Sequence, residues 1–444
     1  MFVFCCLKQT SRDIQSPLCA MDGATCVDST SHLHENQEDH TSSENVVYSL
    51  LSEQSSNVYY QRDQTTRDSY VSSHRLWYIK HREDIVRWLD FLVIVLLIGP
   101  LTVVYWRGTW SLMNVYLFPN NDVISAWTSF AIGTSVVLML NFGQRGLENR
   151  FTRQSVVFHV LLRVYIYVFG FSVVNHWRGC WYILDVHTNM TVLSAIISVV
   201  VPVPILLALR ACGNLVAAPG VVLVDICGTP FRLGTRFAAE VSFSRTFIGD
   251  VVLTVVFIGS LIVASWRGVW LLFDIFLFPT DQERSAWSSV AIGYGTLILL
   301  ALLETPASGL LQKTRRRFAR TVLEDVFKIA VWVGVLSVWR GFWLVCDSYI
   351  LPDNPVQSYW ITHGVGIGGL FLLQAGRSVL VAGCVVDGEA VDGSGVRMGR
   401  YLEQICPKLV RPSTEQVSNQ RNHSDGGQQT TLPPQDVVQY ETNL

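Results

Sequence analysis

A five-residue pattern, Trp-Arg-Gly-x-Trp, occurs four times in this chain, and an acidic or amide residue follows each copy at the same distance. Trp is a rare residue, so four chance copies are not expected. A repeat of this kind constrains the fold more than any other feature does. The members of the repeated unit, W-R-G-x-W-x-x-x-[DN], are Trp106, Arg107, Gly108, Trp110 and Asn114; Trp177, Arg178, Gly179, Trp181 and Asp185; Trp266, Arg267, Gly268, Trp270 and Asp274; and Trp339, Arg340, Gly341, Trp343 and Asp347.

The composition indicates a polytopic membrane protein. Half of the 444 residues are hydrophobic and only 15% are charged, which is too apolar for a soluble protein of this size. The ten Cys contain no C-x-x-C pair, so a zinc site is disfavoured. The sequence also lacks G-x-S-x-G, H-E-x-x-H and Walker A motifs. We therefore expect no catalytic residues, metal, cofactor or nucleic-acid partner.

Apolar stretches of about 20 residues, the length that a bilayer requires, occur eight times. Arg and Lys between these stretches gather on one side, which the positive-inside rule assigns to the cytoplasm. Both termini are then cytoplasmic, and the four motifs lie at the outer ends of the odd-numbered spans. The predicted spans are 88–106, 124–143, 158–176, 190–209, 247–265, 285–303, 322–339 and 358–384.

The two halves of the chain are related by duplication. The 29 residues that begin at Tyr105 align without a gap with those that begin at Ser265. Each block holds an even number of spans, so the copies share one orientation. The predicted fold is an all-α polytopic membrane protein with eight transmembrane helices, arranged as two parallel four-helix repeats. Alternating residues at 223–234 and 385–399 further predict a small cytoplasmic β-hairpin after each block.

This organisation predicts four regions. Residues 1–75 form a disordered cytoplasmic tail, 76–245 the first membrane repeat with its hairpin, 246–411 the second repeat with its hairpin, and 412–444 a disordered cytoplasmic tail.

The repeated motif has two interpretations. Trp at a membrane interface, a snorkelling Arg and a Gly that permits a helix end or a close helix crossing would together make a structural anchor. An anchoring role does not explain the acidic or amide residue at the end of each repeat. This residue follows the Arg by seven residues, so a continuing helix would place the two on one face. A ring of Arg–Asp pairs could be a structural clasp, which we favour, or the mouth of an ion or solute pathway.

Three other features are candidates. Cys180 and Cys346 could form a disulfide, or they could be two buried thiols. Asn189 begins a glycosylation sequon, but it adjoins the fourth span. The chain ends with Thr442 two residues before Leu444, which is typical of a ligand for a PDZ scaffold domain.

With its eight spans, its four W-R-G-x-W units and its long polar tails, the chain resembles the fuseless family of invertebrate membrane proteins over about residues 86–384. The resemblance implies a presynaptic plasma-membrane protein that helps to organise calcium channels and neurotransmitter release. It carries over no functional residues beyond the motif itself. The leading hypothesis is therefore a non-enzymatic membrane organiser. The alternative is a solute transporter or ion channel that uses the Arg–Asp pairs.

Overall fold

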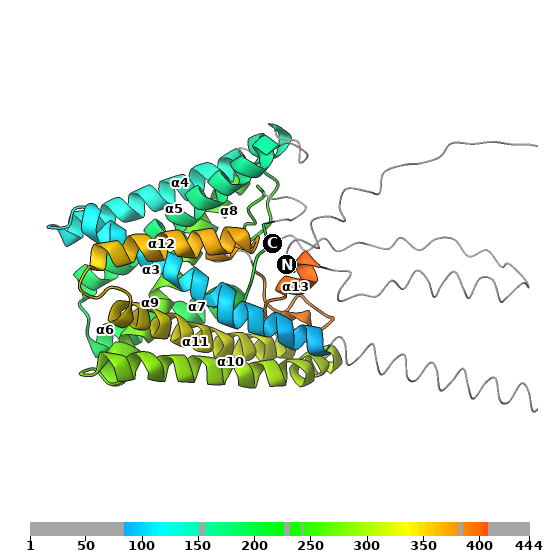
Figure 1. Ribbon diagram of the computed structural model, residues 1–444. Coiled ribbons are helices and arrows are strands. Elements are labelled where there is room, and N and C mark those ends of the chain that lie inside the picture. Colours follow the sequence, from blue (N-terminus) through cyan, green and yellow to red (C-terminus); the bar gives the residue numbers. More distant parts are fainter. Residues whose placement is uncertain (1–83, 151–155, 226–230, 242–243, 381–384, 407–444) are drawn as a thin grey trace, which may run out of the picture. The chain divides into compact units, whose positions relative to one another are not determined.

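The computed structural model describes residues 84–150, 156–225, 231–241, 244–380 and 385–406 (Figure 1). The chain divides into two compact units, Met1–Val86 and Arg87–Leu444, and nearly all described residues belong to the second. The predicted tails, 1–75 and 412–444, lie outside the described residues, and so do the PDZ-ligand candidates Thr442 and Leu444.

The described residues form helices and connecting turns, without a strand. In chain order the elements are η1 (Ile94–Ile98), α3 (Gly99–Tyr116), α4 (Asp122–Arg150), α5 (Val156–Thr188), α6 (Val192–Val200), α7 (Pro202–Ala208), η2 (Cys212–Leu215), α8 (Arg245–Val252), η3 (Leu253–Ile258), α9 (Gly259–Phe276), α10 (Gln282–Lys313), α11 (Arg317–Tyr349), α12 (Pro355–Leu372), η4 (Gly376–Val379), η5 (Ser394–Val396) and α13 (Tyr401–Ile405). Here η1 and η3 are π-helical, whereas η2, η4 and η5 are 3₁₀ turns.

In the described part of the chain, six helical segments are long and apolar enough to cross a membrane, which indicates a membrane protein. They are Asp84–Tyr116, Asp122–Glu148, Val156–Thr188, Arg245–Phe276, Gln282–Lys313 and Arg317–Tyr349.

The fourth and eighth predicted spans do not reach this standard. The fourth corresponds to the shorter helix Val192–Ala208, in which Pro202 separates α6 from α7 because proline cannot donate a backbone hydrogen bond. The eighth corresponds to α12, which ends at Leu372 instead of continuing to 384 and contains the polar residues Ser358, Thr362 and His363.

The four motif helices, α3, α5, α9 and α11, form the inner layer of the bundle. Each outer helix packs mainly on the inner helix of the next unit along the chain: α4 on α5, α6 on α9 and α10 on α11. The last contact joins α12 to α3, so the end of the bundle packs on its beginning (Figure 1). The four units thus form a closed ring.

The motif glycines explain how closely these layers approach. A Cβ atom at Gly108 would lie 2.4 Å from the backbone nitrogen of His363 on α12, and one at Gly179 would lie 2.2 Å from that of Phe130 on α4. Such distances are shorter than any real Cβ contact, so only glycine fits at these crossings. Of the two roles considered for the motif Gly, a helix end or a close helix crossing, the close crossing describes Gly108 and Gly179.

The motifs lie within the inner helices, so the helix continues past each Arg, which is the condition for placing the acid on the same helix face. Each inner helix continues about ten residues beyond its Arg, to Tyr116, Thr188, Phe276 or Tyr349. One or two residues after each of these helix ends, a residue has a left-handed backbone, with φ between 49° and 59°: Phe118, Asn189, Phe278 and Leu351. The chain can continue as helix past the Arg because the Arg is buried and paired, as described below.

The predicted β-hairpins are wrong for the described residues of 223–234 and 385–399. They form no local ladder, and two of their backbone N–H groups bond to carbonyl groups in the opposite half of the chain. Asp225 N donates to Gln374 O at 2.8 Å, and Asp387 N donates to Arg210 O at 2.9 Å. The two contacts are reciprocal. In each, an aspartate N–H of one half donates to a carbonyl oxygen just after an outer helix of the other half.

Candidate functional site

The first tryptophan of each motif belongs to one closed tier at the centre of the bundle. Around the ring, neighbouring indole centroids lie 5.2 Å apart for Trp106–Trp177, 5.5 Å for Trp177–Trp266, 5.3 Å for Trp266–Trp339 and 5.2 Å for Trp339–Trp106. All four contacts are edge-to-face, which is the favourable geometry for aromatic pairs. No more than 5% of any of these four residues is exposed.

The second tryptophan of each motif forms a second tier one helical turn further along. Trp110, Trp181, Trp270 and Trp343 again close a ring, with centroid distances of 5.7 to 6.0 Å and edge-to-face planes. Residues four apart lie on the same helix face, which explains why both tryptophans of a motif point inward. The eight indoles fill the centre of the bundle at both levels.

The four motif arginines are buried beside these tiers, and each binds the polar residue of the preceding unit. The Nε–Oδ1 distances are 2.8 Å for Arg107–Asp347, 2.8 Å for Arg178–Asn114, 2.6 Å for Arg267–Asp185 and 2.9 Å for Arg340–Asp274. Spacing along one helix suggested pairing within a unit. The pairs instead join neighbouring units, because residues on one face of an inner helix point toward the adjacent helix of the ring.

A ladder of hydroxyl groups completes each arginine site, and sequence reasoning missed it. Arg178 donates to Ser125 Oγ at 2.8 Å and to Ser129 Oγ at 3.0 Å, and Arg340 donates equivalently to Ser285 and Ser289. The remaining pairs are Ser194 and Ser198 for Arg267, and Ser358 and Thr362 for Arg107. The signal was present: Ser-x-x-x-[Ser/Thr] begins all four outer helices.

The unit with Asn114 in place of an acid has its own compensation. The Arg178 guanidinium lies 4.6 Å from the centroid of the Tyr182 ring, and Tyr182 donates its hydroxyl to Asn114 at 3.0 Å. A cation–π contact of this kind supplies part of the attraction that a carboxylate gives elsewhere. The arginine is 1% exposed, so its charge requires such partners.

Indole N–H groups tie the first tier to the turns at one end of the bundle. Trp106 Nε1 donates to Val379 O in η4, and Trp266 Nε1 donates to Leu215 O in η2, both at 3.0 Å. Each bond joins a tryptophan of one half to the last residue of a 3₁₀ turn in the other half. The two turns occupy matching positions, shortly after α7 and after α12. Trp339 donates to Ala218 O at 2.6 Å.

Two buried carboxylates hold these turns in place. Asp225 accepts from Arg377 N in η4 at 2.8 Å, and Asp387 accepts from Gly213 N in η2 at 3.1 Å. Asp225 also pairs with Arg163, and Asp387 pairs with Lys328 at 2.8 Å. Burial raises the pKa of the Asp225 carboxyl, and the positive charge of Arg163 opposes that change.

Of the two alternatives for Cys180 and Cys346, the structure does not contain the disulfide, since both residues are free and buried. Cys180 lies on α5 and Cys346 on α11, which are opposite members of the inner ring. The tryptophan tiers fill the space between these two helices. The alternative, two buried thiols, describes the structure.

Nothing among the described residues groups three His, Cys, Asp or Glu side chains in a way that could hold a metal ion. The motif residues form a closed core of aromatic rings, and the charged Arg–Asp pairs lie around the outside of that core.

Comparison with known proteins gives one match. The family model described as Fuseless matches residues 85–380, which contain all four motifs. No curated protein and no solved structure matches this chain. The matched region covers more than half of the chain, and the chain therefore belongs to the Fuseless family of membrane proteins.

Proposed function

We propose that this protein is a non-enzymatic organiser of presynaptic sites in the plasma membrane, which supports calcium-channel localisation and neurotransmitter release through scaffold contacts. The helical bundle anchors the protein, and the polar tails recruit partners. Membership of the Fuseless family is consistent with this role. The closely packed tryptophan core is the observation that favours an organiser over a transporter.

The packing of the core favours an anchor. Edge-to-face rings with centroids 5.2 to 5.5 Å apart leave no room for an ion or solute between them. The arginines are fully engaged: Arg267 is 0% exposed and bonds to Asp185, Ser194 and Ser198. A clasp of this kind holds four units in one ring, whereas a conducting site requires charged groups that face water.

The topology is part of the proposal. We infer that all eight predicted spans cross the membrane, as two parallel repeats within 76–245 and 246–411, with both termini in the cytoplasm. The short helix Val192–Ala208 spans about 25 Å at 1.5 Å per residue, slightly less than the ~30 Å hydrocarbon core. Local thinning of the bilayer accommodates such a difference.

The test of the organiser role uses the last four residues. Full-length protein and a version that lacks Glu441–Leu444 are expressed in neurons, and surface localisation, co-precipitation of PDZ scaffolds and clustering of presynaptic calcium channels are measured. We expect truncation to reduce all three while total protein is unchanged. Unchanged clustering and co-precipitation would reject the scaffold contact through Thr442 and Leu444.

The second candidate function is transport of an ion or solute along the Arg–Asp ring, favoured by the parallel duplication of the sequence. Substituting Arg178 and Arg340 distinguishes the two functions. A transporter would lose flux at normal abundance, whereas an organiser would lose folded protein. Flux into vesicles that contain the purified protein, normalised to the folded fraction, measures the difference.

A further inference from the structure

One side of the bundle contains a cavity beside the motif ring. It has a volume of about 130 Å³ and lies between α4, α5 and the π-helical turn η3. Its walls are mainly apolar, with Val137, Phe169, Val173 and Val255 among them. That volume is close to a cavity of about 150 Å³ that holds one benzene molecule, so it admits a few carbons of a chain.

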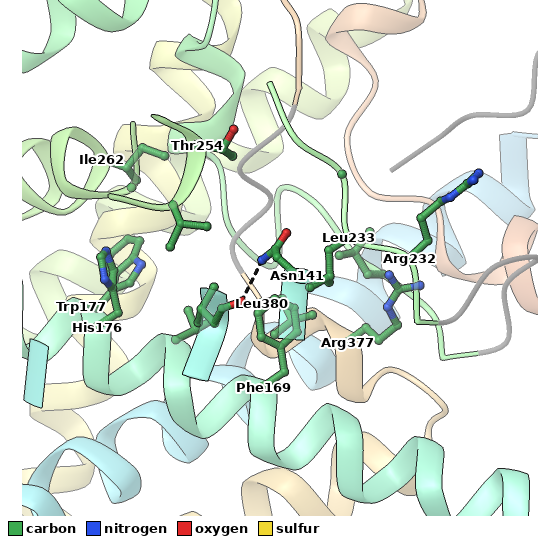
Figure 2. A pocket seen from close by; sticks show the side chains of 16 residues that line it. Asn141, Phe169, His176, Trp177, Arg232, Leu233, Thr254, Ile262, Arg377 and Leu380 are labelled. Carbon is green, nitrogen blue, oxygen red and sulfur yellow. Dashed lines mark hydrogen bonds between the residues drawn. The ribbon is translucent and has the colours of Figure 1, made fainter. Parts of the chain in front are cut away.

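The two ends of this cavity differ in chemistry. Figure 2 shows His176 and Trp177 at one end and Arg232 and Arg377 at the other. The lining includes both arginines and no carboxylate. Arg377 is 8% exposed, whereas Arg232 lies at the surface. A buried guanidinium and an exposed one at the mouth of an apolar cavity suit an anionic headgroup that carries an apolar chain.

A buried nitrogen at the inner end also points to an occupant. His176 is 5% exposed, and its Nδ1 lies 2.9 Å from Thr134 Oγ1. Its Nε2 has no hydrogen-bond partner in the described part of the chain. Buried polar atoms are normally paired with protein, ordered water or ligand. The inner end of the cavity is therefore expected to be filled by a further molecule.

The other half of the chain shows what closes such a space. The position of Thr134 is taken there by Tyr294, whose hydroxyl donates to Val95 O in the π-helical turn η1 at 3.2 Å. The position of His176, directly before the motif tryptophan, is taken by Val338, which is fully buried. Pro219 also lies against Gly99, whereas the equivalent Gly259 faces His176 Nε2. In the first half, the polar side chains of His176, Asn141 and Thr254 instead line the cavity.

We propose that this cavity binds an anionic phospholipid, with its phosphate on Arg232 and Arg377 and the first carbons of one acyl chain beside Phe169 and Val255. The inference goes beyond the organiser role. It places the site at the cytoplasmic leaflet of the proposed topology, where anionic lipids are enriched.

The experiment uses the purified full-length chain, stripped of lipid in detergent and titrated with phosphatidylserine or with phosphatidylcholine of the same acyl chains. Bound lipid is counted by native mass spectrometry. We expect phosphatidylserine to bind at least fivefold more tightly. Arg232→Gln should weaken its binding about fivefold, the equivalent of one basic contact. Arg397→Gln is the matched control, because Arg397 holds the corresponding surface position in the second half, and it should change nothing.

A second variant tests the cavity itself. Val255→Phe fills the space, so it should abolish lipid binding while the thermal unfolding midpoint stays within a few degrees of the parent value. Equal binding of the two lipids, or unchanged binding in Arg232→Gln, would overturn the headgroup assignment. Full binding by Val255→Phe would overturn the location. Free oleate that binds the stripped protein and is not displaced by phosphatidylserine would show a fatty-acid site instead and overturn the phospholipid proposal.

Discussion

The two halves of the bundle are alike at the tryptophan and arginine tiers and differ beside their π-helical turns. At the tiers, Arg178 and Arg340 bind matching serines at distances that agree within 0.4 Å. Beside η1 the space is filled by Tyr294, whereas beside η3 a cavity remains next to His176. A duplicated chain thus keeps the contacts on which ring closure depends, and it is free to diverge where one side chain can fill or open a space.

The largest expected effect tests the shared tier. Arg340→Ala should lower the free energy of unfolding by about 3–5 kcal/mol, because it leaves Ser285, Ser289 and Asp274 without their buried partner. Arg178→Ala should cost less, since its partner Asn114 is neutral. Denaturation in detergent micelles measures both. Arg284→Ala is the control, because that side chain is 74% exposed and should change stability little. Equal losses for Arg340 and Arg284 would contradict the clasp.

The next effect tests the helix crossings in both halves. Gly133→Ala places a Cβ 2.1 Å from His176 N, and Gly293→Ala places one 2.6 Å from Val338 N. Each should cost about 1–3 kcal/mol through overpacking, with the larger loss at Gly133. Gly364→Ala on α12 meets nothing within 4 Å and should be neutral or slightly stabilising. Thermal unfolding of the three variants provides the comparison, and a neutral Gly133→Ala would show that the crossing is looser than described.

A smaller effect tests the difference between the halves. Tyr294→Phe removes the hydroxyl that donates to Val95 O and should cost about 1 kcal/mol. The ring remains, so no cavity should open in the second half and lipid binding should not change. The double variant Thr134→Tyr with His176→Val gives the first half the residues of the second. It should lose lipid binding, and a variant that retains it would separate the cavity from these two positions.

The smallest effect concerns the one neutral member of the ring. Asp274→Asn copies the arrangement of Asn114, and Asp274 is 44% exposed, so the change should cost less than about 1 kcal/mol. Asp274→Leu, which removes the acceptor from Arg340 Nε, should cost more. The stability of the Asp274→Asn and Asp274→Leu variants is compared by their thermal unfolding midpoints at low and at high salt. A larger loss for Asn than for Leu would contradict the hydrogen-bond role assigned to this position.

Several features of the arginine site were within reach of the sequence. The spacing of Trp106 and Trp110 placed both on one helix face, and the acid seven residues after each Arg indicated a paired charge. The Ser-x-x-x-[Ser/Thr] pattern also recurs at fixed distance, but hydroxyl residues are common and the pattern becomes meaningful only beside a buried guanidinium. Spacing along one helix cannot tell whether an Arg binds its own unit or the next one, which depends on how neighbouring helices meet.

The sequence by itself determined that this is a helical membrane protein of the Fuseless family built from four W-R-G-x-W units, because composition, hydrophobic length and an exact repeat are properties of the chain alone. Only the tertiary structure decided that α12 packs on α3, that the tryptophans close into two tiers and that the arginines bind across units. It also showed that Cys180 and Cys346 are free, and that the described residues of 223–234 and 385–399 form no strand. These outcomes depend on contacts between residues far apart in the chain, such as Arg107 and Thr362, which are 255 positions apart. No local pattern specifies which of several helix faces will meet.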